Sequence, residues 1–229
     1  MIPWNQRTHN NNIINQKSDV MKKIIAFIVA LVLLVPAYAD AANKALEKAR
    51  NKELKTKLKE YKKGKWEILG SRTLEFSLAK HYDRLNELGD DGHEVEGIST
   101  RTKSKNTGKQ MAINNAAITY AQEAGSSLQG RVVADMNANG ADPAGEFDNF
   151  YAAYERLVEK EIRNELEPSY SIIRTNPDGS FEIRSYFIVA ESAAAKARQR
   201  ALESAMKDSE LAQKHADKIA GFVKESFQE

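Results

Sequence analysis

Hydrophobic side chains recur at three- and four-residue spacing in five segments of the chain, which is the periodicity of one face of a helix. These segments are residues 41–63, 74–88, 106–136, 147–166 and 192–227. The fourth has the clearest pattern, with aromatic and aliphatic residues on one face and charged residues opposite. The last predicts a single long helix, about 50 Å long if it is straight at ~1.5 Å per residue.

Four shorter segments have the composition and alternation of strands. Residues 64–70 form one candidate, and residues 93–103 form a second in which Gly97 suggests a β-bulge. The strongest signal is a hairpin over residues 170–189, whose strands flank Asn176-Pro177-Asp178-Gly179. Proline presets the first turn dihedral and glycine accepts the positive one. The element order predicts an α+β fold: a small, mostly antiparallel sheet of about four strands, covered by long helices, with a long C-terminal helix.

The N-terminal region has the layout of a secretory signal peptide. Two lysines follow Met21, an unbroken hydrophobic run spans residues 24–35, and small residues precede Asp40. We expect residues 21–39 to be the signal peptide, with cleavage before Asp40. A membrane-spanning helix needs about 20 hydrophobic residues, so this run is too short for a retained anchor. Residues 1–20 are rich in asparagine and lack hydrophobic periodicity, so either translation starts at Met21 or they form a disordered extension.

Composition and charge narrow the compartment and the classes of function. The chain has no cysteine, which excludes disulfides, thiolate metal sites, a cysteine nucleophile and the acylated cysteine of a lipoprotein. Residues 40–229 carry 30 basic and 31 acidic side chains, whereas nucleic-acid-binding proteins have a strong basic excess. We therefore expect a periplasmic or secreted protein that has no transmembrane span after cleavage and does not bind nucleic acid.

Positive charge is concentrated near the start of the exported chain. Ten basic and three acidic residues lie between Lys44 and Lys65. The thin hydrophobic stripe here favours a solvated helix that leans on the body, and the alternative is a basic arm for an anionic membrane surface or an acidic envelope protein. We divide the exported chain into a basic helical arm, residues 40–63, and a single α+β domain, residues 64–229. The alanine-rich surface of the last helix raises a homodimer as a hypothesis.

Four quoted segments carry a resemblance to a known family. They are NNAAITYAQEAGSSLQGRVVADMN, FYAAYERLVEKEI, SYSIIRTNPDGSFEIRSYFIVAE and AAAKARQRALESAMKDSELAQKHADKIAGFVKESF. Their succession resembles the Lpp-twenty family of bacterial envelope lipoproteins, in its exported Bacteroides-type branch, over about residues 63–227. The resemblance implies an α+β envelope protein without an established enzymatic activity. The family's lipoproteins carry an acylated cysteine that this chain lacks, so neither a lipid anchor nor any functional residue is transferred.

Residues 135–146, DMNANGADPAGE, fit the spacing D-x-N-x-N-G-x5-E of an EF-hand calcium loop. The side-chain ligands would be Asp135, Asn137, Asn139 and Glu146. Asp142 stands where an aliphatic residue normally packs, Pro143 stiffens the loop, and no second loop accompanies it. We favour a polar turn between two helices, with a weak calcium site as the alternative.

Other chemical motifs in the chain are weak. Ser77 and Lys80 fit S-x-x-K, but the companion motifs of penicillin-recognising enzymes are absent. His81, His93 and His215 are too scattered to predict a zinc site, and His81 borders a hydrophobic helix face where a packed histidine is expected. The aromatic residues Phe147, Phe150, Tyr151 and Tyr154 have the helical spacing of a core rather than of a ligand-binding stack.

These observations lead to two hypotheses of function. The first is a non-enzymatic, exported envelope protein that acts by binding or assembly, with no catalytic residues, metal site or cofactor and an unidentified partner. The second is a calcium-responsive binding module that uses residues 135–146.

Overall fold

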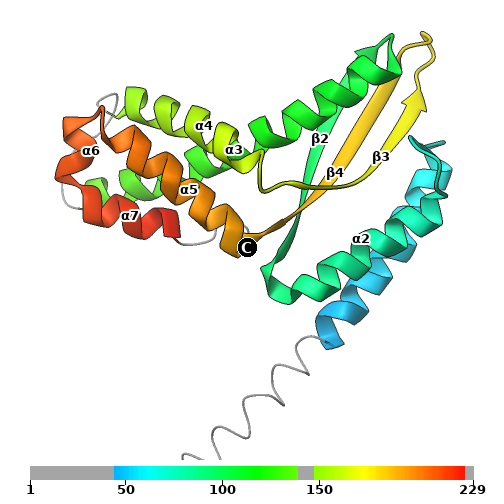
Figure 1. Ribbon diagram of the computed structural model, residues 1–229, viewed down its shortest axis with the longest axis horizontal. Coiled ribbons are helices and arrows are strands. Elements are labelled where there is room, and N and C mark those ends of the chain that lie inside the picture. Colours follow the sequence, from blue (N-terminus) through cyan, green and yellow to red (C-terminus); the bar gives the residue numbers. More distant parts are fainter. Residues whose placement is uncertain (1–43, 139–146, 225–229) are drawn as a thin grey trace, which may run out of the picture. The chain divides into compact units, whose positions relative to one another are not determined.

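The computed structural model describes residues 44–138 and 147–224 of the chain. From Ala49 onward they belong to one compact unit, in which a four-stranded antiparallel sheet and a bundle of helices share the long helix α3 (Figure 1). The α+β class and the antiparallel sheet expected from the sequence are confirmed. The helix of residues 44–63 joins this unit from Ala49, so most of the segment described above as an arm is part of the body.

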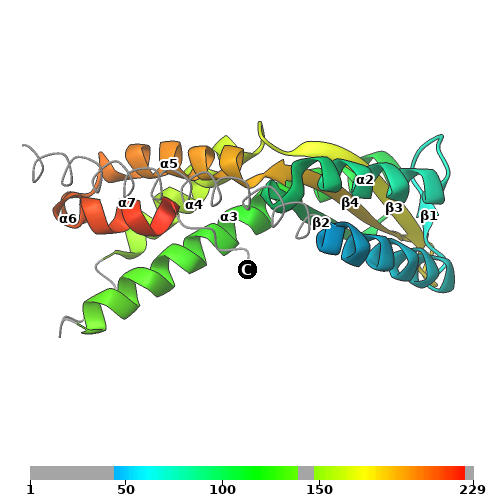
Figure 2. The ribbon, with the colours of Figure 1, turned by 90° about the horizontal axis from the view of Figure 1, so that it is seen from below.

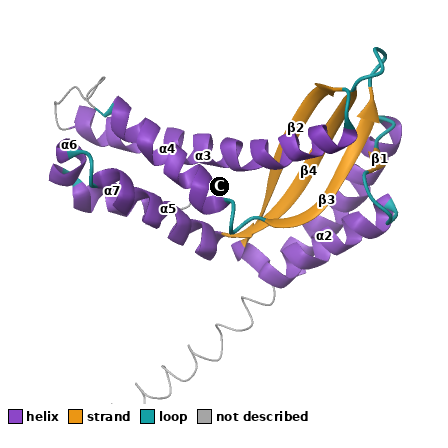
Figure 3. Cartoon of the chain, turned by 45° about the horizontal axis from the view of Figure 1, so that its top comes forward, coloured by secondary structure: helices purple, strands orange, loops and turns teal. Residues whose placement is uncertain are grey.

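The sheet has the strand order β1-β3-β4-β2, and each neighbouring pair is antiparallel. The strands are β1 (Glu67–Ile68), β2 (Gly92–Thr102), β3 (Glu167–Thr175) and β4 (Phe181–Ala190). Gly179 has a φ of +77° in the turn between β3 and β4, as the Pro-Asp-Gly sequence predicts. Among the described strands, β2 is paired on one side only, so that it forms an edge of the sheet (Figure 3).

One face of the sheet is covered by residues 49–63 of the N-terminal helix and by α2 (Leu74–Leu88) (Figure 2). The Thr73 side chain caps α2 by accepting a hydrogen bond from the Phe76 backbone N–H at 3.2 Å. Gly89, with a φ of 59°, ends the helix, in a backbone conformation that glycine adopts readily. The core of this layer consists of Tyr61, Leu74, Leu78, Tyr82, Leu85, Tyr170, Ile172, Tyr186 and Ile188.

The first half of α3 (Lys105–Ala138) covers the opposite face and approaches β2 closely. A Cβ atom added at Gly97 would lie 1.9 Å from the Ala112 carbonyl oxygen and 2.6 Å from the Ala116 backbone nitrogen. Glycine is therefore needed here because a helix packs against the strand. The β-bulge predicted at Gly97 is wrong, because the register of β2 with β4 is regular there and shifts only between Ser99 and Thr102.

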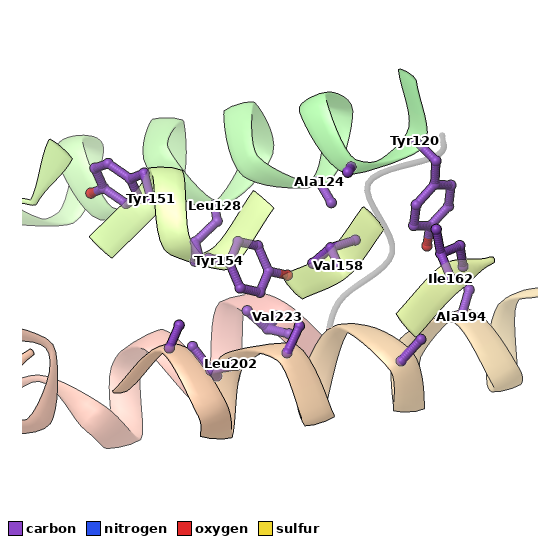
Figure 4. Packing of buried hydrophobic residues seen from close by; sticks show 14 of the residues in the cluster. Tyr120, Ala124, Leu128, Tyr151, Tyr154, Val158, Ile162, Ala194, Leu202 and Val223 are labelled. Carbon is purple, nitrogen blue, oxygen red and sulfur yellow. The ribbon is translucent and has the colours of Figure 1, made fainter. Parts of the chain in front are cut away.

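The second half of α3 forms a bundle with the remaining helices, and the side chains between them make the largest hydrophobic core (Figure 4). These helices are α4 (Asp148–Ile162), α5 (Glu191–Met206), α6 (Glu210–Lys214) and α7 (Ala216–Lys224). The aromatic residues at the start of α4 are buried in this core, as their helical spacing predicts: Phe147, Phe150, Tyr151 and Tyr154.

The C-terminal segment is helical, but the single long helix expected over residues 192–227 is wrong. The chain leaves the helix after Met206, and Ser209 caps α6 by accepting a hydrogen bond from the Ala212 backbone N–H at 3.2 Å. Helix α7 then packs beside α5 and α3, which buries Ile219 and Val223. The alanine-rich face of α5 is buried within the same chain, so it does not provide the surface for a second copy that the sequence suggested.

Candidate functional site

A buried histidine on α2 links the hydrophobic core between α2 and the sheet to the protein surface. His81 is only 1% exposed, although it is a titratable residue. Its Nε2 atom lies 2.7 Å from Oε2 of Glu94 on β2, and its Nδ1 atom lies 2.9 Å from Oγ of Ser169 on β3. Ser169 is exposed, so this chain of polar contacts runs from the protein interior to solvent.

Glu94 also contacts a lysine from the N-terminal basic helix. Nζ of Lys57 lies 2.7 Å from Oε1 of Glu94, and the two side chains are 19% and 24% exposed. Burial by itself raises the pKa of Glu94, but His81 and Lys57 outweigh that effect and hold this pKa below its usual range. Burial likewise lowers the pKa of Lys57, and Glu94 more than offsets it, so the net shift is upward. The pair is therefore charged at neutral pH.

The partners of His81 assign its tautomer. An ionised Glu94 can only accept a hydrogen bond, so an N–H belongs on Nε2, the ring nitrogen of His81 that faces the carboxylate. Nδ1 then carries the lone pair and accepts the hydroxyl proton of Ser169. Nε2 of His81 and Oε2 of Glu94 are only 2.7 Å apart, yet neither atom has a hydrogen bond of acceptable geometry. The carboxylate oxygen therefore lies off the Nε2–H direction.

A β-bulge directs Ser169 toward the histidine. Pro168 pairs with Phe187 and Tyr170 pairs with Tyr186, which leaves Ser169 as the extra residue of β3 with no partner on β4. A bulge bends its strand and re-aims the side chain of the extra residue. Here it turns the Ser169 hydroxyl toward α2.

Ser169, His81 and Glu94 are the residue types of a serine hydrolase triad, but their arrangement differs from it. In such a triad Nε2 of the histidine faces the serine and the carboxylate accepts from Nδ1–H. Here Nδ1 faces the serine, Lys57 neutralises the carboxylate, and the carboxylate is out of line with the imidazole N–H. These differences favour a role for His81 in orienting the Ser169 hydroxyl.

Ser169 lies on a surface pocket of about 220 Å³ between α2 and β3, which we call the α2–β3 pocket. Its lining consists of Ile68, Leu69, Gly70, Ser71, Arg72, Ser77, Lys80, Ser169, Tyr170 and Ser171. Arg72 and Lys80 are exposed, flank the Phe76 ring at 5.6 and 6.0 Å, and have no carboxylate partner among the described residues. No acidic residue belongs to the lining of the α2–β3 pocket, whereas an adjoining pocket of about 370 Å³ shares Arg72, Lys80 and Ser169 and also contains Asp83, Glu87 and Glu167.

The pocket also holds a hydroxyl group without a partner. Ser77 is 8% exposed, and within the described chain its hydroxyl makes no hydrogen bond. The hydroxyl oxygen itself is not fully buried, so it is open to a hydrogen-bond acceptor in the pocket. Two cations and the Ser77 hydroxyl converge on a space suited to a small anion or an anionic group, and the Ser169 hydroxyl, whose proton is donated to His81, lines the same space.

The S-x-x-K motif and the histidines singled out in the sequence lie in different environments in the structure. Ser77 and Lys80 both line the α2–β3 pocket, but no hydrogen bond joins them in the part of the chain that the structure describes. His81 is packed, as expected, whereas His93 is half-buried on β2 and His215 lies 6.1 Å from the Phe147 ring. Across residues 44–138 and 147–224, no cluster of three histidine or acidic side chains is placed to hold a metal ion.

The EF-hand-like loop falls mostly beyond the described residues. Asn139 and Glu146 lie outside them, as does the side chain of Asn137. Asp135, the first ligand of the motif, lies on α3 and forms an ion pair with Lys218 of α7 at 2.7 Å. The calcium site thus stays a hypothesis, with one candidate ligand already paired to a lysine.

The polar chain from Lys57 to Ser169 was not predicted from the sequence. A signal was present, because Lys57 and His81 each interrupt the hydrophobic face of their helix, and a polar residue at such a position needs a buried partner. The partners themselves lie far away along the chain, 37 residues for Lys57 with Glu94 and 88 residues for His81 with Ser169. Local periodicity carries no information on such pairs.

Two further observations bear on function. Among the described residues, no helix is both long and apolar enough to cross a membrane. The chain matches no protein-family model, no curated protein sequence and no solved structure.

Proposed function

We propose that this chain is an exported, non-enzymatic protein of the bacterial cell envelope, which binds an anionic group of another envelope component in the α2–β3 pocket. The observation that carries the proposal is the pair Arg72 and Lys80, two cations without a carboxylate partner in the described structure, beside the unpartnered hydroxyl of Ser77. The signal-like residues 21–39 and the resemblance to the Lpp-twenty family support the envelope location.

Several basic residues of the N-terminal helix form contacts within the fold, so this helix is a weaker candidate for the anion-binding site than the α2–β3 pocket. Arg50 donates hydrogen bonds to the carbonyl oxygens of Leu85 and Gly89, Lys57 pairs with Glu94, and Lys62 pairs with Glu75 at 2.7 Å. The remaining lysines of this helix are exposed and spread along it. They supply a diffuse positive field that attracts anions without selecting among them.

The test compares two double variants that remove the same charge. Arg72→Gln with Lys80→Gln removes the pocket cations, and Lys59→Gln with Lys63→Gln removes two exposed cations of the basic helix. Binding of inorganic phosphate and of acetate is measured by calorimetry on the wild-type chain and both variants. We expect the pocket variant to weaken binding about tenfold or more, since charged hydrogen bonds contribute about 1.5–3 kcal/mol each, and the control to change it little.

Three outcomes would contradict the proposal. Equal loss in both variants would indicate a non-specific charge effect, and no binding to the wild-type chain would remove the site. Covalent labelling of Ser169 by a fluorophosphonate probe would show an activated nucleophile and would contradict the non-enzymatic part. Vesicles of anionic phospholipid, compared with phosphatidylcholine vesicles, separate a lipid headgroup from a soluble source of the same anion.

A further inference from the structure

The edge strand β2 leaves part of its backbone without hydrogen-bond partners. The carbonyl oxygen of Ile98 accepts a hydrogen bond from Nδ2 of Asn115 at 2.7 Å, and that of Gly92 accepts from Nη2 of Arg50 at 3.3 Å. Alternate residues of an antiparallel strand point their N–H and C=O groups to the same side. The outward set, away from β4, therefore consists of Gly92, Glu94, Glu96 and Ile98.

Side chains protect the two ends of this outward edge but not its middle. Asn115 covers it at Ile98 and Arg50 covers it at Gly92. Within the described chain, the backbone groups of Glu94 and Glu96 make no hydrogen bond outside the sheet. An open edge of this kind is a template for another strand, and proteins usually block it. In β2 the blocking side chains leave the backbone of Glu94 and Glu96 uncovered between them.

A groove runs beside this open stretch. It has a volume of about 530 Å³ and lies between β2 and α3, with a lining of Glu94, Val95, Glu96, Ile98, Asn115, Ile118, Thr119, Gln122 and Glu123. Ile98 is 38% exposed and Ile118 is half-buried, so apolar surface lies beside the free backbone groups. Glu123 is exposed and forms no ion pair with any described residue, so it gives this groove an unbalanced negative charge.

We propose that an extended peptide segment of a partner protein, carrying a lysine or arginine, binds in this groove by adding a strand to β2 at Glu94 and Glu96. The open backbone groups would supply the hydrogen bonds, Ile98 and Ile118 would contact an apolar side chain, and Glu123 would pair with the basic one. This site is separate from the α2–β3 pocket, because the two linings share no residue. Glu94 is the lining residue that also takes part in the polar chain described above, and it does so through its side chain.

Charge disfavours a second copy of the chain as the occupant. In an antiparallel pairing of two β2 strands centred on Val95, Glu94 of each copy would stand opposite Glu96 of the other. Like charges directly opposite each other on neighbouring strands are destabilising. A basic peptide instead meets the carboxylate of Glu123, which forms no ion pair within the described chain.

The test uses a proline substitution that acts on the outward edge alone. Because the N–H of Glu96 points away from β4, Glu96→Pro removes one outward donor and leaves the ladder with β4 in place. Glu96→Thr is the matched control, since it also removes the carboxylate, which accepts a hydrogen bond from Tyr186 at 2.7 Å, but keeps the backbone N–H. The probe is a fluorescent, end-blocked heptapeptide of alternating threonine and valine with one central lysine, titrated into the full-length chain and followed by anisotropy.

We expect saturable binding with a dissociation constant of about 1 mM or tighter, about fivefold weaker for Glu96→Pro than for Glu96→Thr, the change for one net hydrogen bond. Glu123→Gln should weaken the lysine peptide about two- to fivefold and leave an alanine-substituted peptide unaffected. Equal binding by the proline and threonine variants, or no binding to the wild-type chain, would overturn the proposal. So would a dimer that light scattering detects in the wild-type chain and not in the proline variant, because the occupant would then be a second copy.

Discussion

Substitution of Gly97 by alanine tests the closest contact between the sheet and a helix. The added Cβ would lie 1.9 Å from the Ala112 carbonyl oxygen, whereas non-bonded carbon contacts are favourable at about 3.5–4.0 Å. The nearby Ala116 backbone nitrogen, at 2.6 Å, is also part of α3, so no flexible side chain can move aside. The helix must withdraw from β2 by about 1.5 Å or more to accommodate the methyl group.

The cost of this displacement can be estimated from overpacked cores. Extra methyl groups in well-packed sites destabilise proteins by about 1–3 kcal/mol and occasionally more. Because the obstacle at Gly97 is backbone, we expect about 3 kcal/mol, measured by urea denaturation followed by circular dichroism. Withdrawal of α3 would also widen the groove beside β2 and weaken peptide binding there.

Gly130→Ala is the internal control for this measurement. Gly130 also lies in α3, but a Cβ atom at this position has nothing within 4 Å. Alanine is better than glycine in a helix interior, so this variant should gain about 0.5–1 kcal/mol. A Gly97→Ala protein within about 0.5 kcal/mol of wild type, the range of ordinary surface substitutions, would refute the reasoning.

Two further predictions concern the polar chain and the loop. Lys57→Met should destabilise the protein by about 2 kcal/mol at pH 7, because it leaves the carboxylate of Glu94 without its main counter-charge. Folding lowers the pKa of Glu94, so the ionised carboxylate stabilises the fold at neutral pH, and this stabilisation is lost as the pH falls through the folded pKa. The difference in unfolding free energy between wild type and Glu94→Gln should therefore shrink below about pH 4. A difference that stays constant with pH would contradict this. Millimolar calcium should leave the thermal midpoint unchanged, because Asp135 pairs with Lys218; a calcium-dependent rise that Glu146→Gln abolishes would establish the calcium-responsive alternative.

The sequence by itself determined most of the elements and the fold class. Helical periodicity located α2, the long α3 and α4, and turn chemistry located the β3–β4 hairpin, because these signals arise from residues a few positions apart. Thr73 and Gly89, which cap and end α2, are residue types that favour those two positions.

Tertiary structure decided the break in the C-terminal helix. Ala212, Ile219 and Val223 continue the hydrophobic periodicity of α5, so the pattern is the same for one long helix and for a chain that folds back. Folding back buries Ile219 and Val223 against the bundle, which a straight helix would leave uncovered. The gain in buried apolar area outweighs the few helical hydrogen bonds lost around residues 207–209.

Both candidate binding surfaces also depend on tertiary structure. The α2–β3 pocket needs Ser169 brought to Arg72, Ser77 and Lys80 by a bulge that no local pattern announced. The open edge of β2 exists because the strand order places β2 outermost and because Asn115 and Arg50 cover only its ends. Periodicity shows which face of a helix or strand is buried. A binding site depends on which helices and strands lie next to each other, and only the packing of the whole chain determines this.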